Sequence, residues 1–200
     1  MNSQQKFGRR SIRVDGYDYS QPGGYFITLC TKNRECLLGS VKDGEVRLNK
    51  HGEIVQSEWL RASKGFHGVI VDQFIIMPNH LHAIILISNN VGAIHELPLQ
   101  VAGVNTQTAR RRMLLPMIIG RFKMQSAKYI NQTRNTADKP VWQRNYYEHI
   151  IRNDDELNKI REYIINNPLQ WQFDRENPAG MNNKLPRQWR ELEEKIYGKR

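Results

Sequence analysis

Apolar residues along this chain fall into short runs separated by polar turns, which is typical of a protein that contains both strands and helices. The densest run extends from Phe74 to Ile87 and consists mainly of β-branched and aliphatic residues, as buried strands do. Pro78-Asn79 interrupts this run and divides it into two strands. Together with the other apolar runs, the pattern predicts strands at 25–31, 68–77, 80–87 and 141–151.

Helices are predicted where apolar residues recur every three or four positions. Ile54, Val55, Trp59 and Leu60 form such a stripe after Asn49, whose side chain can cap the first turn of a helix. The same periodicity, with acidic residues favouring a helix start at 154–156, predicts helices at 50–64, 114–132, 154–166 and 187–197.

The order of elements is strand, hairpin, helix, strand, strand, helix, strand and helix, with the hairpin turning at Asp43-Gly44. The connections are too short for repeated parallel crossovers, so we expect an antiparallel sheet. The fold class is α+β, and the expected architecture is a ferredoxin-like sandwich with helices packed on one face of the sheet. One domain is expected at 21–172, between a basic N-terminal arm at 1–20 and a basic C-terminal tail with a short helix at 173–200.

The charge of the chain indicates the class of partner. Lys and Arg total 30 against 20 Asp and Glu, so the formal net charge is +10. No Asp or Glu occurs between Leu97 and Ala137, and a segment with one sign of charge is typical of phosphate contacts, although a solvated helix face is the alternative. We therefore expect a nucleic-acid partner. The candidate DNA-binding residues of this segment are Arg110, Arg111, Arg112, Arg121, Lys123 and Lys128.

Other features argue against a membrane or secreted protein. No stretch approaches the ~20 uncharged apolar residues that cross a bilayer. The basic segment from Met1 to Arg13 is not followed by the apolar core of a secretory signal. Cys30 and Cys36 are too few to form a disulfide scaffold, which favours a reducing cytosol. We therefore expect a cytoplasmic protein that has no membrane partner and associates with the nucleoid through DNA.

His80 and His82 form the first candidate site. Side chains alternate along a strand, so these two imidazoles point to one side of the strand at 80–87 while Leu81 points to the other. Two neutral imidazoles on a rigid strand can bind a divalent metal ion. The alternative is a pair of core histidines held by hydrogen bonds, and the pair itself does not decide between the two.

A second candidate set lies on the helix predicted at 154–166. Tyr163 and Asn167 are four residues apart and share one face of that helix, which Lys159 extends by another turn. A phenol, an amide and an ammonium group in a row are unusual for a purely structural surface. The alternative is an amphipathic tyrosine at the rim of the core and an asparagine that ends the helix before Pro168.

The motif at 77–82, Met-Pro-Asn-His-Leu-His, followed later by the Tyr-Ile-Ile-Asn-Asn-Pro motif at 163–168, resembles the single-tyrosine HUH transposases. HUH stands for His, a hydrophobic residue and His. Within that superfamily the chain is most similar to the REP-associated tyrosine transposases, and the segments at 24–28 and 142–152 match them as well. The resemblance covers roughly residues 20–172, so it implies an HUH transposase domain at 21–172.

The resemblance implies a role for each matching residue. Tyr163 would be the catalytic nucleophile, which attacks a phosphate of single-stranded DNA to give a 5′-phosphotyrosine and a free 3′-hydroxyl. His80, His82 and Asn167 would hold Mg²⁺ or Mn²⁺, which polarises the scissile phosphate. The implied function is that of a metal-dependent transposase and endonuclease that nicks and rejoins single-stranded, hairpin-bearing DNA with REP-like sequences. The resemblance leaves open whether the protein acts as a monomer or a homodimer.

Three alternatives remain at this point. Tyr146 and Tyr147 lie near His149 and are rival nucleophiles, although a place on a strand favours packing or stacking on bases. A non-catalytic DNA-binding protein with the same fold would need the basic surface but not the metal site. An unrelated metal hydrolase is disfavoured because the run at 83–85, directly after the histidine pair, supplies no carboxylate ligand.

Overall fold

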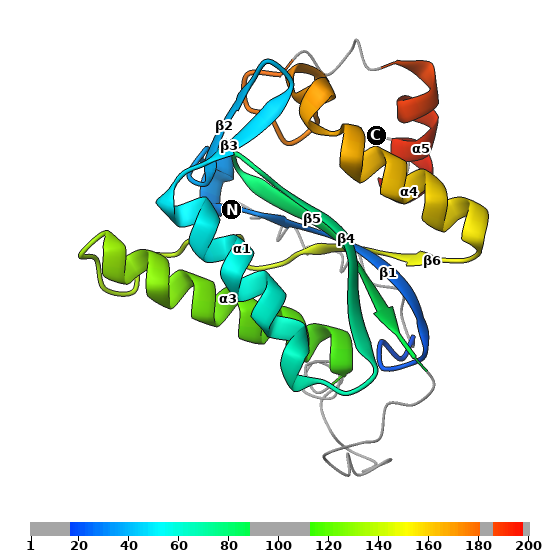
Figure 1. Ribbon diagram of the computed structural model, residues 1–200, viewed down its shortest axis with the longest axis horizontal. Coiled ribbons are helices and arrows are strands. Elements are labelled where there is room, and N and C mark those ends of the chain that lie inside the picture. Colours follow the sequence, from blue (N-terminus) through cyan, green and yellow to red (C-terminus); the bar gives the residue numbers. More distant parts are fainter. Residues whose placement is uncertain (1–16, 89–112, 181–185, 198–200) are drawn as a thin grey trace, which may run out of the picture.

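The computed structural model describes residues 17–88, 113–180 and 186–197. Four strands form an antiparallel sheet in the order β4-β5-β1-β6 (Figure 1). The part of the expected N-terminal arm at 1–16, the loop expected at 88–108 beyond its first residue, and Arg110, Arg111 and Arg112 lie outside the described residues. The strands are β1 (Gly23–Cys30), β4 (Val69–Met77), β5 (His80–Ile87) and β6 (Tyr147–Ile151).

The topology of the sheet is ferredoxin-like. Helix α1 (Lys50–Ala62) connects β1 to β4, and helix α3 (Leu114–Thr133) lies between β5 and β6. The first and third strands of the sheet along the chain, β1 and β5, are therefore the central pair. A separate hairpin of β2 (Gly39–Lys42) and β3 (Glu45–Leu48) precedes α1. The predicted antiparallel α+β fold is confirmed.

Helices α1 and α3 cover one face of the sheet (Figure 1). Alternate strand residues such as Ile27 on β1 and Ala83 on β5 are fully buried against them. The rings of Trp59 on α1 and Phe122 on α3 pack edge to face with centroids 5.0 Å apart, which joins the two helices above the sheet. This layer corresponds to the one-sided packing expected from the sequence.

The opposite face of the sheet is covered as well, by α4 (Asp154–Asn166) and α5 (Arg187–Tyr197). The strand residues on this face include Phe26 and Ile84, which are apolar and fully buried. Ile164 of α4 and Ile196 of α5 pack against them. Both faces of β1 and β5 thus carry buried apolar residues, so a second helical layer is needed to exclude water from them.

Helix α4 is fixed at its start and along its length. Asn153 caps the helix by accepting a hydrogen bond from the Glu156 amide at 2.9 Å. Arg161 donates from Nε to Asp72 Oδ2 at 3.0 Å, which ties α4 to an irregularity in β4. The chain then turns at Asn167 into the short helix η3 (Pro168–Phe173), which leads back toward the sheet.

Single-turn helices η1 (Lys32–Arg34) and η2 (Ser63–Gly65) follow β1 and α1. Of the strand predicted at 141–151 only β6 is a continuous strand. Trp142 forms an isolated bridge with Thr31, and Lys123 Nζ binds the carbonyls of Gln143 and Arg144 between that bridge and β6. Among the described residues, no helix is both long and apolar enough to span a membrane.

Candidate functional site

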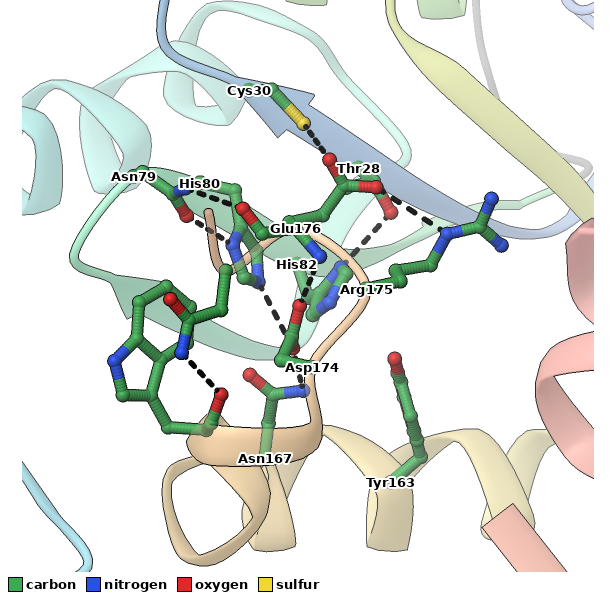
Figure 2. A network of polar contacts seen from close by, with 12 residues as sticks. Thr28, Cys30, Asn79, His80, His82, Tyr163, Asn167, Asp174, Arg175 and Glu176 are labelled. Atoms are coloured by element: carbon green, nitrogen blue, oxygen red, sulfur yellow. Dashed lines mark hydrogen bonds and ion pairs between the residues drawn. The ribbon is translucent and has the colours of Figure 1, made fainter. Parts of the chain in front are cut away.

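The histidine pair faces the layer formed by α4 and α5. His80 lies opposite Cys30 and His82 lies opposite Thr28 in the register of β5 with β1, on the same face as Phe26. Both histidine side chains are completely buried. Helix α4 crosses this face, and η3 returns the chain so that Asp174 lies beside the pair (Figure 2).

The ring of His80 is held by Asn79. Asn79 Nδ2 donates to the carbonyl of Glu176 at 2.7 Å and to that of Arg34 at 3.1 Å, so its Oδ1 is the atom directed at His80. That oxygen lies 2.9 Å from His80 Nδ1, which must therefore carry the proton and donate it. The other ring nitrogen, Nε2, is left with its lone pair facing the site.

The ring of His82 is held by Thr28. The Thr28 hydroxyl lies 2.9 Å from His82 Nδ1 (Figure 2). It also lies 2.8 Å from the hydroxyl of Tyr197, at the end of α5. A proton on Nδ1 that is donated to Thr28 Oγ1 satisfies this chain of contacts, with Thr28 donating in turn to Tyr197. In this arrangement His82 Nε2 also presents a lone pair to the site.

Several buried acceptor atoms meet here without a donor among the described residues. Nε2 of His80, Nε2 of His82 and Oδ1 of Asn167 are buried and have no hydrogen-bond partner there. Asp174 Oδ2 lies 3.8 Å from His80 Nε2 and accepts a hydrogen bond from Asn167 Nδ2 at 2.9 Å. The ligand atoms of His80, His82 and Asp174 lie within 4.8 Å of one another.

Buried acceptors that face one another are costly, because each has lost its hydrogen bonds to water. A cation between them would satisfy the two lone pairs and the oxygens together. Imidazole nitrogens combined with amide and carboxylate oxygens are ligands of divalent ions such as Mn²⁺. The residues present therefore fit a divalent metal ion.

Burial sets the protonation of the histidine pair. It is the main reason why the pKa of His80 lies below the ordinary value, although the charge of Asp174 acts in the opposite direction. Burial likewise lowers the pKa of His82, and the neighbouring His80 and Arg175 lower it further. Both imidazoles are therefore neutral at neutral pH, which is the form that binds a metal ion.

Tyr163 stands next to this cluster and is almost completely buried. Its ring lies beside His82, with centroids 5.5 Å apart, and its hydroxyl donates to Glu193 Oε1 of α5 at 3.2 Å. Burial first, and then the charges of Tyr197, Asp174 and Glu193, raise the pKa of Tyr163 well above the ordinary value. The phenol is thus protonated and covered by α5.

The structure brings the side chains of His80, His82, Tyr163 and Asn167 together, and the ligand and nucleophile roles expected for them stay predictions. Lys159 is exposed on α4. The rival tyrosines have other surroundings. Tyr147 donates its hydroxyl to the carbonyl of Ile196, and Tyr146 packs against the core on the opposite face of the sheet. His149 pairs with Glu156 at 3.1 Å, away from the histidine pair.

Three residues of the site were not predicted from the sequence. Asp174 lies in the segment expected to be a tail, and Glu193 lies on the helix expected at 187–197, with no motif to mark either of them. Thr28 belongs to a predicted strand, but its place opposite His82 depends on a strand register that one sequence does not reveal.

The described members of the basic set lie on α3, which covers the opposite face of the sheet from the histidine pair. Arg121 and Lys128 are exposed, and Lys128 lines an open hollow of about 800 Å³ together with Lys139. Lys123 is half-buried and engaged with the Gln143 carbonyl at 2.5 Å. The structure therefore does not place these cations next to the candidate site.

Comparison with known proteins gives two sequence relatives, whereas no family model matches the chain. A Haemophilus influenzae protein, which carries no functional name, is 42% identical over 166 residues, or 83% of this chain and 91% of the relative. A second H. influenzae protein, whose name assigns it to the REP-associated tyrosine transposases, is 28% identical over 95 residues, or 48% of this chain and 47% of that relative. The resemblance to this class is thereby confirmed.

Two solved structures are similar in outline. One is a REP-associated tyrosine transposase bound to a REP hairpin, with a TM-score of 0.47 and 18% identity over 80% of this chain and 73% of that one. The other is a Deinococcus radiodurans protein named as a transposase, with a TM-score of 0.44 and 13% identity over 77% of this chain and 95% of that one.

Proposed function

We propose a function for this chain from two findings. The chain belongs to the same protein family as the 42% identical H. influenzae protein, and it resembles the REP-associated tyrosine transposases. The chain is a single-tyrosine DNA transposase that nicks and rejoins single-stranded DNA beside a hairpin. One observation carries the proposal, which is that Tyr163 packs against His82 at the place where unbonded acceptor atoms of His80, His82 and Asn167 gather.

The proposed metal ligands are His80, His82 and Asn167, and Asp174 joins them as a fourth. A carboxylate makes the set harder and more anionic than two imidazoles and an amide, which suits Mg²⁺ or Mn²⁺. When bound, the ion acts as a Lewis acid that polarises the scissile phosphate. Asn79 and Thr28 keep the imidazole Nε2 atoms directed inward by holding the Nδ1 protons.

Tyr163 supplies the nucleophile. Its oxygen forms a bond to phosphorus, the bond from phosphorus to the 3′ oxygen breaks, and the product is a 5′-phosphotyrosine ester. The phenol gives up its proton and the leaving 3′ oxygen takes one up, so a 3′-hydroxyl is formed. Attack of a 3′-hydroxyl on the phosphotyrosine reverses these changes and joins the strands. The ester conserves the energy of the phosphodiester, so joining needs no nucleotide cofactor.

The net charge of +10 supports a DNA partner for the chain as a whole. A non-catalytic DNA-binding protein with the same fold is the alternative function. That alternative gives no reason why acceptor atoms of His80, His82 and Asn167 are buried beside Asp174 without donors among the described residues.

The proposal is tested with labelled single-stranded oligonucleotides that carry a hairpin and a randomised flank, incubated with the full chain and Mn²⁺ or Mg²⁺. We expect cleavage that depends on the metal and is abolished in His82→Ala, while hairpin binding in a mobility-shift assay is retained. His51→Ala on α1 is the matched control and leaves both unchanged. Hairpin binding without cleavage under any metal would establish the non-catalytic alternative.

A further inference from the structure

The segment from Asp174 to Glu176 crosses the candidate site as a rigid loop. Asp174 Oδ1 accepts a hydrogen bond from the Glu176 amide at 2.6 Å, and the Glu176 carbonyl accepts from Asn79 at 2.7 Å. The Glu176 carboxylate binds Arg34 at 2.9 Å and accepts from Cys30 at 3.3 Å. These contacts fix both neighbours of Arg175, so the point from which its side chain leaves the backbone is fixed as well.

The guanidinium of Arg175 lies on the ring of Tyr197, with its central carbon 4.0 Å from the ring centroid. Its Nε is 3.4 Å from Glu176 Oε1, and among the described residues its two terminal nitrogens make no hydrogen bond. The side chain is 22% exposed. Arg175 therefore carries a positive charge and two terminal nitrogens that bond to no described residue. Stacking on the ring of Tyr197 holds the guanidinium in one orientation.

The Arg175 side chain lies on the same side of the histidine pair as Tyr163. In Figure 2 the side chains of Arg175 and Tyr163 are both on the side of His82 that faces away from His80. The contacts agree with the picture, because Phe26 packs against both Tyr163 and Tyr197, the ring on which Arg175 lies. The charge of Arg175 also reaches His82, whose pKa it lowers.

A phosphodiester under attack gains negative charge on its two non-bridging oxygens. A metal ion held by the histidine pair would neutralise part of this charge, and a second cation would be needed to neutralise the rest. Arg34, Arg161 and Lys195 are committed to the carboxylates of Glu176, Asp72 and Glu156. Among the described residues near the site, Arg175 keeps free donors.

We propose that Arg175 is a further catalytic residue, which binds the second non-bridging oxygen of the scissile phosphate through its terminal nitrogens. The inference rests on the proposed function and adds the group that recognises the phosphate itself. A guanidinium fork matches the geometry of two phosphate oxygens, whereas an ammonium group contributes only charge. Arg175 thus orients the phosphate between the histidine pair and Tyr163 and stabilises its charge during attack.

The test measures the rate at which each protein forms the adduct with two substrates. One is an oligonucleotide that the wild type cleaves. The other has the same sequence with a methylphosphonate at the scissile position, and its two diastereomers are used separately. In the methylphosphonate one non-bridging oxygen is replaced by an uncharged methyl group. We expect Arg175→Ala to slow adduct formation about 100-fold on the phosphate but little on the diastereomer that lacks the contacted oxygen. Arg175→Lys recovers part of the rate, and Arg47→Ala, an exposed change on β3, is the control and leaves the rates on both substrates unchanged.

Because the ratio of the two rates is taken within one protein, partial misfolding of a variant cancels from it. An unchanged ratio in Arg175→Ala, for both diastereomers, would overturn the inference while leaving the transposase function in place. If the wild-type chain forms no adduct with any oligonucleotide, the proposed function fails and the inference fails with it.

Discussion

The hydroxyl of Tyr163 donates a hydrogen bond to Glu193 Oε1 at 3.2 Å, so the proposed nucleophile is bonded to a carboxylate of the C-terminal helix α5. Trp189 of the same helix packs on the ring of Tyr163, with centroids 6.0 Å apart. A phosphate that approaches this oxygen meets the negative charge of Glu193. The described arrangement therefore favours a protonated, covered tyrosine, and attack on DNA requires Glu193 to separate from it.

Glu193→Gln is predicted to accelerate formation of the covalent adduct. The substitution removes the negative charge of Glu193, which raises the pKa of Tyr163 and repels the phosphate of the substrate. An increase of roughly tenfold corresponds to one pKa unit. Single-turnover adduct formation measures it, and Glu191→Gln, an exposed change on α5 next to Arg187, is the control. A slower reaction in Glu193→Gln would mean that the carboxylate assists the tyrosine.

Thr28→Val is predicted to weaken metal binding without touching a ligand. The valine has the same shape but no hydroxyl, so His82 Nδ1 loses its partner at 2.9 Å and the ring is free to turn. Loss of such an outer contact lowers metal affinity by about 10- to 100-fold. Titration of Mn²⁺ followed by electron paramagnetic resonance measures it. Thr28→Ser keeps the hydroxyl and should bind as the wild type does, and equal affinity in Thr28→Val would refute the role of Thr28.

Asp174→Asn tests the fourth ligand. The substitution keeps the size of the side chain but removes its charge, so we expect Mn²⁺ to bind more weakly and to raise the melting temperature less than in the wild type. Asparagine has one acceptor oxygen in place of the two that bind the Asn167 amide group and the Glu176 backbone amide, so the metal-induced shift is compared within each protein. Asp138→Asn on an exposed turn is the control. The same metal-induced shift in Asp174→Asn and wild type would exclude Asp174 as a ligand.

Much of the site follows from local geometry that a sequence reveals. Alternation along β5 places His80 and His82 on one face, and helical spacing places Tyr163 and Asn167 on one side of α4. Asp174 and Glu193 could not be found in this way, because only the return of η3 and the docking of α5 bring them to the histidine pair. Helices were expected on one face of the sheet, and the structure adds α4 and α5 on the other face, where Ile84 of the apolar run from Phe74 to Ile87 is buried.

Glu156 is predicted to make the stability of the fold depend on pH. Burial raises the pKa of its carboxyl, but hydrogen bonds from the Arg152 amide at 2.8 Å, from Lys195 and from His149 outweigh burial and leave it below the ordinary value. A pKa that is lower in the folded state means that the unfolded chain binds the proton more readily. The contribution is therefore complete above the ordinary pKa of 4.5 and is lost as the pH falls through the folded-state value.

Glu156→Gln should accordingly lower the free energy of unfolding by about 1–3 kcal/mol at pH 7, and the difference from wild type should shrink toward pH 3. Urea unfolding at several pH values measures it, with the exposed Glu162→Gln on the same helix as control. A difference that stays constant with pH would show that packing, and not the charge, accounts for the effect.

The central claim is that Tyr163 forms a covalent bond to DNA at the metal site. The most direct measurement is mass spectrometry of the proteolysed adduct between the full chain and a cleaved, hairpin-bearing oligonucleotide in Mn²⁺. The proposal predicts that the peptide containing Tyr163 carries a 5′-linked nucleotide, and that Tyr163→Phe abolishes the adduct while Tyr147→Phe retains it. A nucleotide on any other residue, or an adduct that persists in Tyr163→Phe, would contradict the claim.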